Sequence, residues 1–273
     1  FQTLEVENVI VGRAPAVHWI ETRHGPVQVG TMPYPVKQRL LAELPTRGLN
    51  IEELDQMLRE QVAILLANLA EQIDPAIPAV LTGHFTVQGA VLGSERSVML
   101  GRDVAVLPGT LADPAWDYVA LGHIHSYQDL NKGRYPAVVY SGSVERIDFG
   151  EESDPKGFCW VNLRRGETTY EFVELLVRPF LTIRVDVCGQ PDPTAAILRA
   201  IERHSVDGSV VRMIITATPE NENLIRDRDI EQALHRAAFV AAIRREVEHP
   251  VRSRLGVQRI EGLTPLELLE QYL

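Results

Sequence analysis

The sequence has few cysteines and no long apolar run. Its 273 residues include two cysteines, Cys159 and Cys188, and neither has a partner in a CxxC pair. This spacing excludes a disulfide framework and a zinc ribbon. No apolar run approaches the roughly 18 residues that a membrane-spanning helix needs, and the N-terminus lacks the basic and then apolar layout of a secretory signal. We therefore expect a cytoplasmic protein with no membrane contact.

Positive charge is also scarce. The 27 Lys and Arg residues are outnumbered by 37 Asp and Glu residues, which gives a net charge of −10. A protein that relies on broad electrostatic attachment to nucleic acid has the opposite sign. If DNA is the substrate, its phosphates must be met locally by metal ions or by a few arginines. Hydrophobic residues make up 45% of the chain and charged residues 23%, as in a globular protein with a sizeable core.

The length predicts two domains, since one domain usually holds roughly 100 to 200 residues. In residues 1–177 the clearest element is a helix over 51–73, which Asn50 and Glu53 open as a capping box and Pro75 ends. The apolar patterns also predict strands at 4–11, 27–32, 78–81, 116–121, 137–141, 157–163 and 169–176. Polar turns separate the later strands, so we expect them to form a sheet meander.

The pattern changes near Arg178-Pro179. Residues 178–273 are predicted to form strand 181–187, helix 193–204, strand 209–217, helix 227–236, a short strand near 238–243 and a terminal helix over 264–273. Such an alternation predicts a compact α+β unit. The apolar face of the terminal helix fits either packing on this unit or docking of a partner.

Two of the predicted strands run directly into histidines. Gly83-His84 follows the apolar stretch 78–81, and Gly122-His123-Ile124-His125 follows the strand 116–121. The i, i+2 spacing places His123 and His125 on one side of an extended segment. Hydrolysis of a phosphodiester by two metals needs histidines and carboxylates from several strand ends, around cations ~3.5–4 Å apart. A single histidine after a glycine is more often a surface or hydrogen-bonded residue, but the two segments together favour a metal site.

Three segments resemble one known family. "LTGHFTV", "DYVALGHIH" and "YSGSVERIDFGEE" occur in the order of the later motifs of the SbcD-type nucleases of DNA double-strand-break repair. That family consists of calcineurin-like metallophosphoesterases that work with an SMC-class ATPase. The agreement extends to "VGTMPYP", "VRPFLTIRVDV" and "GLTPLELLEQYL" and so covers nearly the whole chain. The resemblance implies an α/β (α+β) fold, with a β-sandwich flanked by helices in 1–177 and a small DNA-contacting cap in 178–273.

The resemblance also implies functional residues. His84 and His123 would be ligands of one Mn²⁺ and His125 a ligand of the other, with Mg²⁺ as a possible substitute. Arg146, within the SGSVER segment, is a candidate contact to a DNA phosphate; the alternative is an ordinary salt bridge with Glu145, Asp148 or Glu151. The implied partners are DNA, an SbcC-type SMC-class ATPase and a second copy of the chain in a homodimer.

The chain departs from the family in its early motifs. The family requires an Asp-x-His, a Gly-Asp and a Gly-Asn-His-Asp, which supply the bridging carboxylate and the general-acid histidine, and this sequence contains none of them. We expect the sequence to correspond to the family without its first sheet and helices. Without an anion between them, two cations would repel each other, so we expect weak metal binding and little or no nuclease activity from this chain.

Three functions remain open. The first is metal-dependent exonuclease and endonuclease chemistry on DNA ends. The second is a metallophosphoesterase that acts on small nucleotides or phosphoproteins. The third is a non-catalytic scaffold that binds the ATPase partner or another copy of itself.

Overall fold

The computed structural model describes residues 9–42, 48–93 and 103–248. The predicted terminal helix at 264–273 and most of the strand predicted at 4–11 lie outside these residues; the described end of that segment, residues 9–11, is not a strand. The described chain divides into two compact units, one that ends at Phe180 and one that begins at Leu181. None of the helices described is long and apolar enough to cross a membrane.

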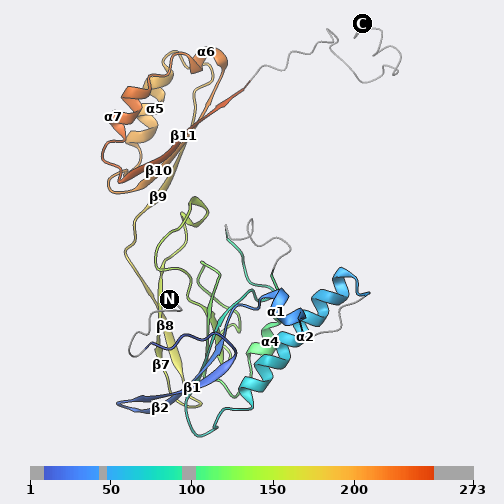
Figure 1. Ribbon diagram of the computed structural model, residues 1–273. Helices are drawn as coiled ribbons and strands as arrows, with labels where there is room; N and C mark the ends of the chain where they lie inside the picture. The colour runs from blue at the N-terminus through green and yellow to red at the C-terminus, as the bar shows by residue number, and fades with distance from the viewer. Residues whose placement is uncertain (1–8, 43–47, 94–102, 249–273) are drawn as a thin grey trace. The chain divides into compact units, whose positions relative to one another are not determined.

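The first unit is built on a six-stranded mixed sheet (Figure 1). Its strands are β1 Ala16–Thr22, β2 Gly25–Met32, β3 Ala79–His84, β4 Tyr118–Gly122, β5 Gln128–Asp129 and β6 Ala137–Tyr140. Their order is β1-β2-β3-β4-β6-β5, in which β2, β3, β4 and β6 are parallel and the two edge strands pair antiparallel to their neighbours. The α/β class is therefore confirmed.

The predicted meander is confirmed only for the strands at 157–163 and 169–176, because the strand at 137–141 lies in the six-stranded sheet. β4 and β6 lie side by side in parallel, and β7 Gly157–Asn162 and β8 Thr169–Glu174 form a separate antiparallel hairpin. The apolar runs of β4 and β6 are explained by this pairing, because parallel strands covered on both faces have continuous apolar segments rather than alternating ones. Most residues of these two strands are buried.

Helices cover one face of this sheet. The long helix α2 (Ile51–Ala70) begins as predicted, with the side chain of Asn50 accepting from the Glu53 N–H and the Glu53 side chain accepting from the Asn50 N–H. The short helices α1 (Lys37–Leu41) and α4 (Pro108–Leu111) lie on the same side (Figure 1). Buried residues of α2 join those of the strands in one apolar core: Leu58, Val62, Leu66 and Leu69 with Met32, Leu81, Val119 and Leu121.

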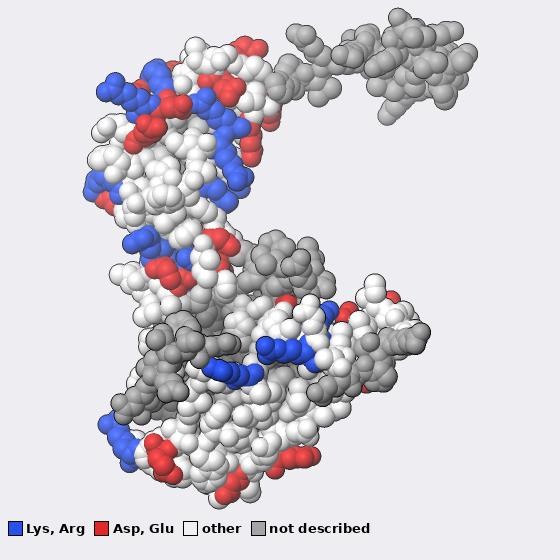
Figure 2. Space-filling view, in the orientation of Figure 1, with Lys and Arg blue, Asp and Glu red and all other residues white. Residues whose placement is uncertain are grey.

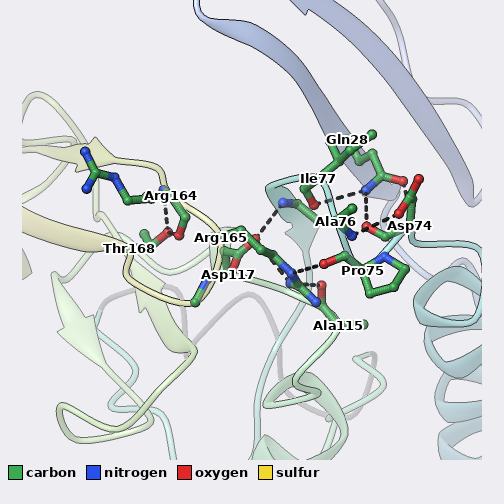
Figure 3. Close-up of polar contacts among 12 residues, drawn as sticks. Gln28, Asp74, Pro75, Ala76, Ile77, Ala115, Asp117, Arg164, Arg165 and Thr168 are labelled. Carbon is green, nitrogen blue, oxygen red and sulfur yellow. Dashed lines mark hydrogen bonds and ion pairs between the residues drawn. The ribbon is translucent and has the colours of Figure 1, made fainter.

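The β7–β8 hairpin is tied to the start of β4. In its turn, Arg165 donates to the Pro75 and Ala115 carbonyls, each at 2.9 Å, and lies 3.2 Å from the carboxylate of Asp117 (Figure 3). Asp117 is buried and also accepts from the backbone N–H groups of Ala79 and Gly166. Burial alone would raise the pKa of Asp117, but the hydrogen bond from the Tyr135 hydroxyl, together with these donors, holds that pKa below its usual value. The hairpin thus has a charged anchor at one end.

The second unit is a three-stranded sheet with helices. Its elements are β9 Phe180–Asp186, α5 Pro193–Glu202, β10 Val210–Ala217, α6 Pro219–Glu222, α7 Asp227–Ala233 and β11 Phe239–Val247, and the sheet order is β11-β10-β9. The predicted alternation is confirmed, although β11 extends beyond the short strand expected at 238–243. The strands and helices share one apolar core. Acidic and basic side chains are interspersed over the visible face of this unit (Figure 2).

Candidate functional site

Two predicted histidines meet at the carboxyl ends of neighbouring parallel strands. β3 ends at His84, which pairs in register with Gly122 at the end of β4, and His123 follows directly. The imidazole centroids of His84 and His123 are 5.1 Å apart. β3 extends to His84, beyond the strand predicted at 78–81, and so carries the ring to the edge of the sheet.

The backbone at this edge is shaped for close approach. A Cβ atom at Gly122 would lie 2.9 Å from Nδ1 of His84, so a side chain there would displace the ring. His123 has a positive φ of 97°, a conformation that costs a non-glycine residue free energy. Such strain persists where the surroundings enforce it, and it is concentrated at functional sites.

A carboxylate that the sequence did not reveal holds His123. Asp103 Oδ2 lies 2.8 Å from Nε2 of His123 and accepts from the Thr86 hydroxyl at 2.7 Å, while Oδ1 accepts from the Tyr34 hydroxyl at 2.5 Å. The Tyr34 ring centroid lies 5.7 Å from that of His123 and 6.5 Å from that of His84. The five side chains therefore form one polar cluster at the sheet edge. Asp103 belongs to no motif, and its partners are distant in sequence.

The titratable groups of this cluster change one another's pKa values. Although His84 keeps much of its surface exposed, partial desolvation lowers its pKa, and the charge of His123 lowers it further. Burial would raise the pKa of Asp103, but hydrogen bonds from Tyr34, His123 and Thr86 outweigh burial and lower it. Burial and the contact with Asp103 raise the pKa of Tyr34 to about 12. The cluster thus favours a neutral His84 beside an ionised Asp103.

His125 is held by a different carboxylate. Its Nδ1 lies 2.7 Å from Oε1 of Glu151, a buried residue whose other oxygen lies 2.8 Å from the ammonium of Lys156. The structure therefore brings His84 and His123 together in one cluster and anchors His125 in another. His125 still lies near enough to His84 to lower the pKa of that imidazole.

The side chain of Arg146 hydrogen-bonds to main-chain carbonyls. Its guanidinium donates to the oxygens of Glu151 at 3.1 Å, Asp154 at 3.0 Å and Arg178 at 3.2 Å. These bonds take the place of the salt bridge that was the alternative at this position. They join the SGSVER segment to the chain just before β9. The predicted contact of Arg146 with a DNA phosphate stays a prediction.

These residues do not by themselves fit the two-metal centre that the resemblance implies. Across 9–42, 48–93 and 103–248, no group of three or more His, Cys, Asp or Glu side chains is arranged to hold a metal ion. The paired imidazoles are suitable donors for a transition metal. They supply part of a ligand set and lack the bridging carboxylate that two adjacent cations need.

Similarity to known proteins bears on this site. The chain matches no protein-family profile. It is 33% identical over 167 residues to the SbcD component of the nuclease SbcCD of Rhodobacter capsulatus, a match that covers 60% of this chain and 38% of that protein. The SbcD component of the nuclease SbcCD of Staphylococcus saprophyticus is 31% identical over 112 residues, which cover 41% of this chain and 28% of that protein. The resemblance to SbcD-like metallophosphoesterases is confirmed.

A further relative supports the same superfamily. The uncharacterized metallophosphoesterase YhaO of Bacillus subtilis is 40% identical over 62 residues, which cover 23% of this chain and 15% of that protein. In all three comparisons the matching segment spans less than two fifths of the relative's length. The similarity therefore supports the resemblance to SbcD-like metallophosphoesterases and leaves the activity of this chain to be proposed.

Proposed function

We propose that this chain is the later part of the phosphoesterase core and the cap of an SbcD-type nuclease, which hydrolyses phosphodiesters at DNA ends with two metal ions. The observation that carries the proposal is the meeting of His84 and His123 at the carboxyl ends of β3 and β4, with centroids 5.1 Å apart. Ligands in sheets with parallel strands bind at these ends. The similarity to proteins named as the SbcD component of the nuclease SbcCD supports the same function.

The proposed metal is Mn²⁺, with Mg²⁺ as a possible substitute. His84 and His123 would hold one ion and His125 the other, since neutral imidazole is an acceptable ligand for such cations. The metal would activate water and stabilise the charge that develops on the phosphate. Because the sequence contains none of the Asp-x-His, Gly-Asp and Asn-His motifs, this polypeptide alone binds the metal weakly and cleaves DNA little or not at all.

The partners and the placement of the protein follow from the family. Two relatives are named as the SbcD component of SbcCD, so an SbcC-type SMC-class ATPase is the proposed partner, with DNA as substrate, a homodimer as the assembly and the cytoplasm as the location. Residues 1–177 would belong to a β-sandwich core and 178–273 to a DNA-contacting cap. The guanidinium of Arg146 has five N–H donors, of which three face carbonyls, so the proposed contact with a DNA phosphate would use the remaining donors.

A non-catalytic role is the second candidate. It is favoured by one observation, the lack of any group of three metal-ligating side chains across the residues described. In that role the chain would bind the ATPase or a second copy of itself. Capture of a purified SMC-class ATPase without metal binding at the histidines would support this role.

Isothermal titration with Mn²⁺ and a cleavage assay on linear duplex DNA test the proposal. We expect weak binding by the 273-residue chain, loss of that binding in the double variant His84→Ala/His123→Ala, and no robust cleavage. The matched control is His204→Ala/His235→Ala, which removes two exposed histidines of the second unit and should bind as the wild type does. Tight binding at two sites, robust cleavage, or binding that survives the first double variant would contradict the proposal.

A further inference from the structure

A charged pair is buried behind His125. Glu151 and Lys156 are each only 1% exposed, and Lys156 Nζ lies 2.8 Å from Glu151 Oε2. The ammonium also donates to the main-chain carbonyl of His125 and to the hydroxyl of Ser143, both at 3.0 Å. A buried ion pair stabilises a fold poorly compared with apolar packing, so its presence beside a predicted site residue calls for another reason.

The two oxygens of Glu151 have separate tasks. Oε2 faces Lys156 and also accepts from the N–H of Ile147 at 3.1 Å, whereas Oε1 lies 2.7 Å from Nδ1 of His125. Lys156 and Ile147 can only donate to this carboxylate. The carboxylate therefore cannot turn away, and Oε1 remains an acceptor directed at the ring.

The backbone around Glu151 is also fixed. Glu151 ends a short 3₁₀ helix, Phe149–Glu151, in which the side chain of Asp148 accepts from the Gly150 N–H. The carbonyl of Glu151 accepts from Arg146. Residues of the SGSVER segment and its continuation thus form a rigid support for the Nδ1 side of His125.

We propose that Glu151, held by Lys156, is a positioning residue that fixes the orientation and the tautomer of His125. In the neutral ring the proton resides on Nδ1, where it is donated to Glu151, and the lone pair resides on Nε2. A carboxylate that orients a histidine in this way makes the ring a better electron-pair donor. The importance of His125 for catalysis rests on the proposed function, but the tautomer does not.

Long-range ¹H–¹⁵N correlation spectra of the imidazoles test the proposal in the metal-free chain at about pH 8, above the usual histidine pKa of about 6.5. We expect His125 to be protonated on Nδ1. In Glu151→Gln, Lys156 and Ile147 keep the one side-chain carbonyl oxygen as their acceptor, so the amide NH₂ group faces Nδ1 of His125. The ring proton of His125 then moves to Nε2. Glu167→Gln, at an exposed ion pair with Arg164, should leave the His125 spectrum unchanged.

The result that would overturn the proposal is a wild-type ring protonated on Nε2, or an Nδ1 proton that persists in Glu151→Gln. If that variant does not fold, Glu151→Leu/Lys156→Met removes both charges together and avoids an unpaired buried ion. We expect the Nδ1–H form to be lost there too, and its persistence would equally overturn the proposal. Because these spectra are recorded without metal or DNA, failure of the proposed nuclease function would leave them unaffected.

Discussion

The approach of His84 to His123 depends on a missing methyl group. Gly122 stands opposite His84 in the β3–β4 register, and its lack of a Cβ atom leaves room for the ring. The positive φ of His123 then turns the second imidazole toward the first at the point where the strand ends. Gly122 thus contributes to the site by leaving space for the His84 ring and not by adopting a positive φ.

Gly122→Ala should separate the two rings. The added Cβ would lie 2.9 Å from His84 Nδ1, so the ring must move outward, and its pKa should rise toward the usual value as burial and the influence of His123 decrease. The cost in stability should be about 1 kcal/mol, because an exposed side chain can yield. A histidine titration followed by NMR measures the shift. Gly109→Ala is the control, since nothing lies within 4 Å of its Cβ position; equal titration curves for wild type and Gly122→Ala would refute the steric argument.

Asp103→Asn should lower the pKa of Tyr34. Burial is the larger cause of that raised pKa of about 12, and the contact with Asp103 is the smaller one. The variant removes the charge of Asp103 and leaves the burial. The tyrosine should then titrate at a lower pH than in the wild type, yet above its ordinary value of about 10. Ultraviolet absorbance titration measures the change, with Tyr34→Phe to assign it. An unchanged titration would mean that the contact at 2.5 Å does not form in solution.

The charged anchor of the β7–β8 hairpin couples three elements. Asp117 precedes β4, accepts from the first residue of β3, and accepts from the hairpin turn at Gly166. His84 and His123 lie at the other ends of β3 and β4, the carboxyl ends, away from Asp117. The anchor therefore fixes the relative register of the strands that bring His84 and His123 together.

Asp117→Asn should destabilise the chain by about 2 kcal/mol at neutral pH, since hydrogen bonds to a buried charged group are worth roughly 1.5 to 3 kcal/mol. The folded-state pKa of Asp117 is lowered, so its contribution is present above the unfolded value of about 3.9 and is lost as the pH falls through the folded value. Urea unfolding at several pH values should show the difference from wild type shrinking below about pH 4. Asp55→Asn, at a more exposed pair with Lys37, should change stability by less than about 1 kcal/mol. A difference that grows in acid would contradict this account.

Local signals in the sequence predicted local structure well. The capping box at Asn50 and Glu53 lies within one turn, so the start of α2 could be identified directly. The strand β1 was missed because its Trp19 and Ile20 are exposed and its pairing with β2 supplies the stability. The five-residue helix α1 is too short for a periodic pattern. Whether β4 and β6 pair in parallel depends on the whole sheet and is not encoded in either segment.

The candidate site divides in the same way. The sequence predicted His84, His123 and His125 as site residues because they lie in Gly-His and Gly-His-x-His segments at the ends of apolar strands. Asp103 could not, since its contact with Tyr34 joins residues 69 positions apart and exists only in the folded chain. The buried pair of Glu151 and Lys156 is a similar case, because burial of charged residues is rare and has no local signature. The sequence marks Arg146 as a candidate phosphate contact, but its hydrogen bonds to main-chain carbonyls depend on the fold around it.

Taken as a whole, the molecule combines two units with different contents. The first has the mixed sheet and the three candidate site histidines, and the second is an α+β unit whose sequence over 181–273 contains 12 arginines and 14 acidic residues. Electrostatic attraction alone would not hold DNA on such a chain. In the proposed function, attachment to phosphate would therefore depend on cations at the sheet edge and on a few arginines, which makes metal binding the central claim of the proposal.

The most direct test is a titration of the 273-residue chain with Mn²⁺, followed by paramagnetic broadening of the individual histidine signals. The account predicts that His84, His123 and His125 broaden first, with half-effects at roughly millimolar concentration, which corresponds to only about 4 kcal/mol of binding free energy. The internal controls, which should respond later, are His18, His24, His204 and His235. Broadening that spreads equally over all these histidines would contradict a metal site at the ends of β3 and β4.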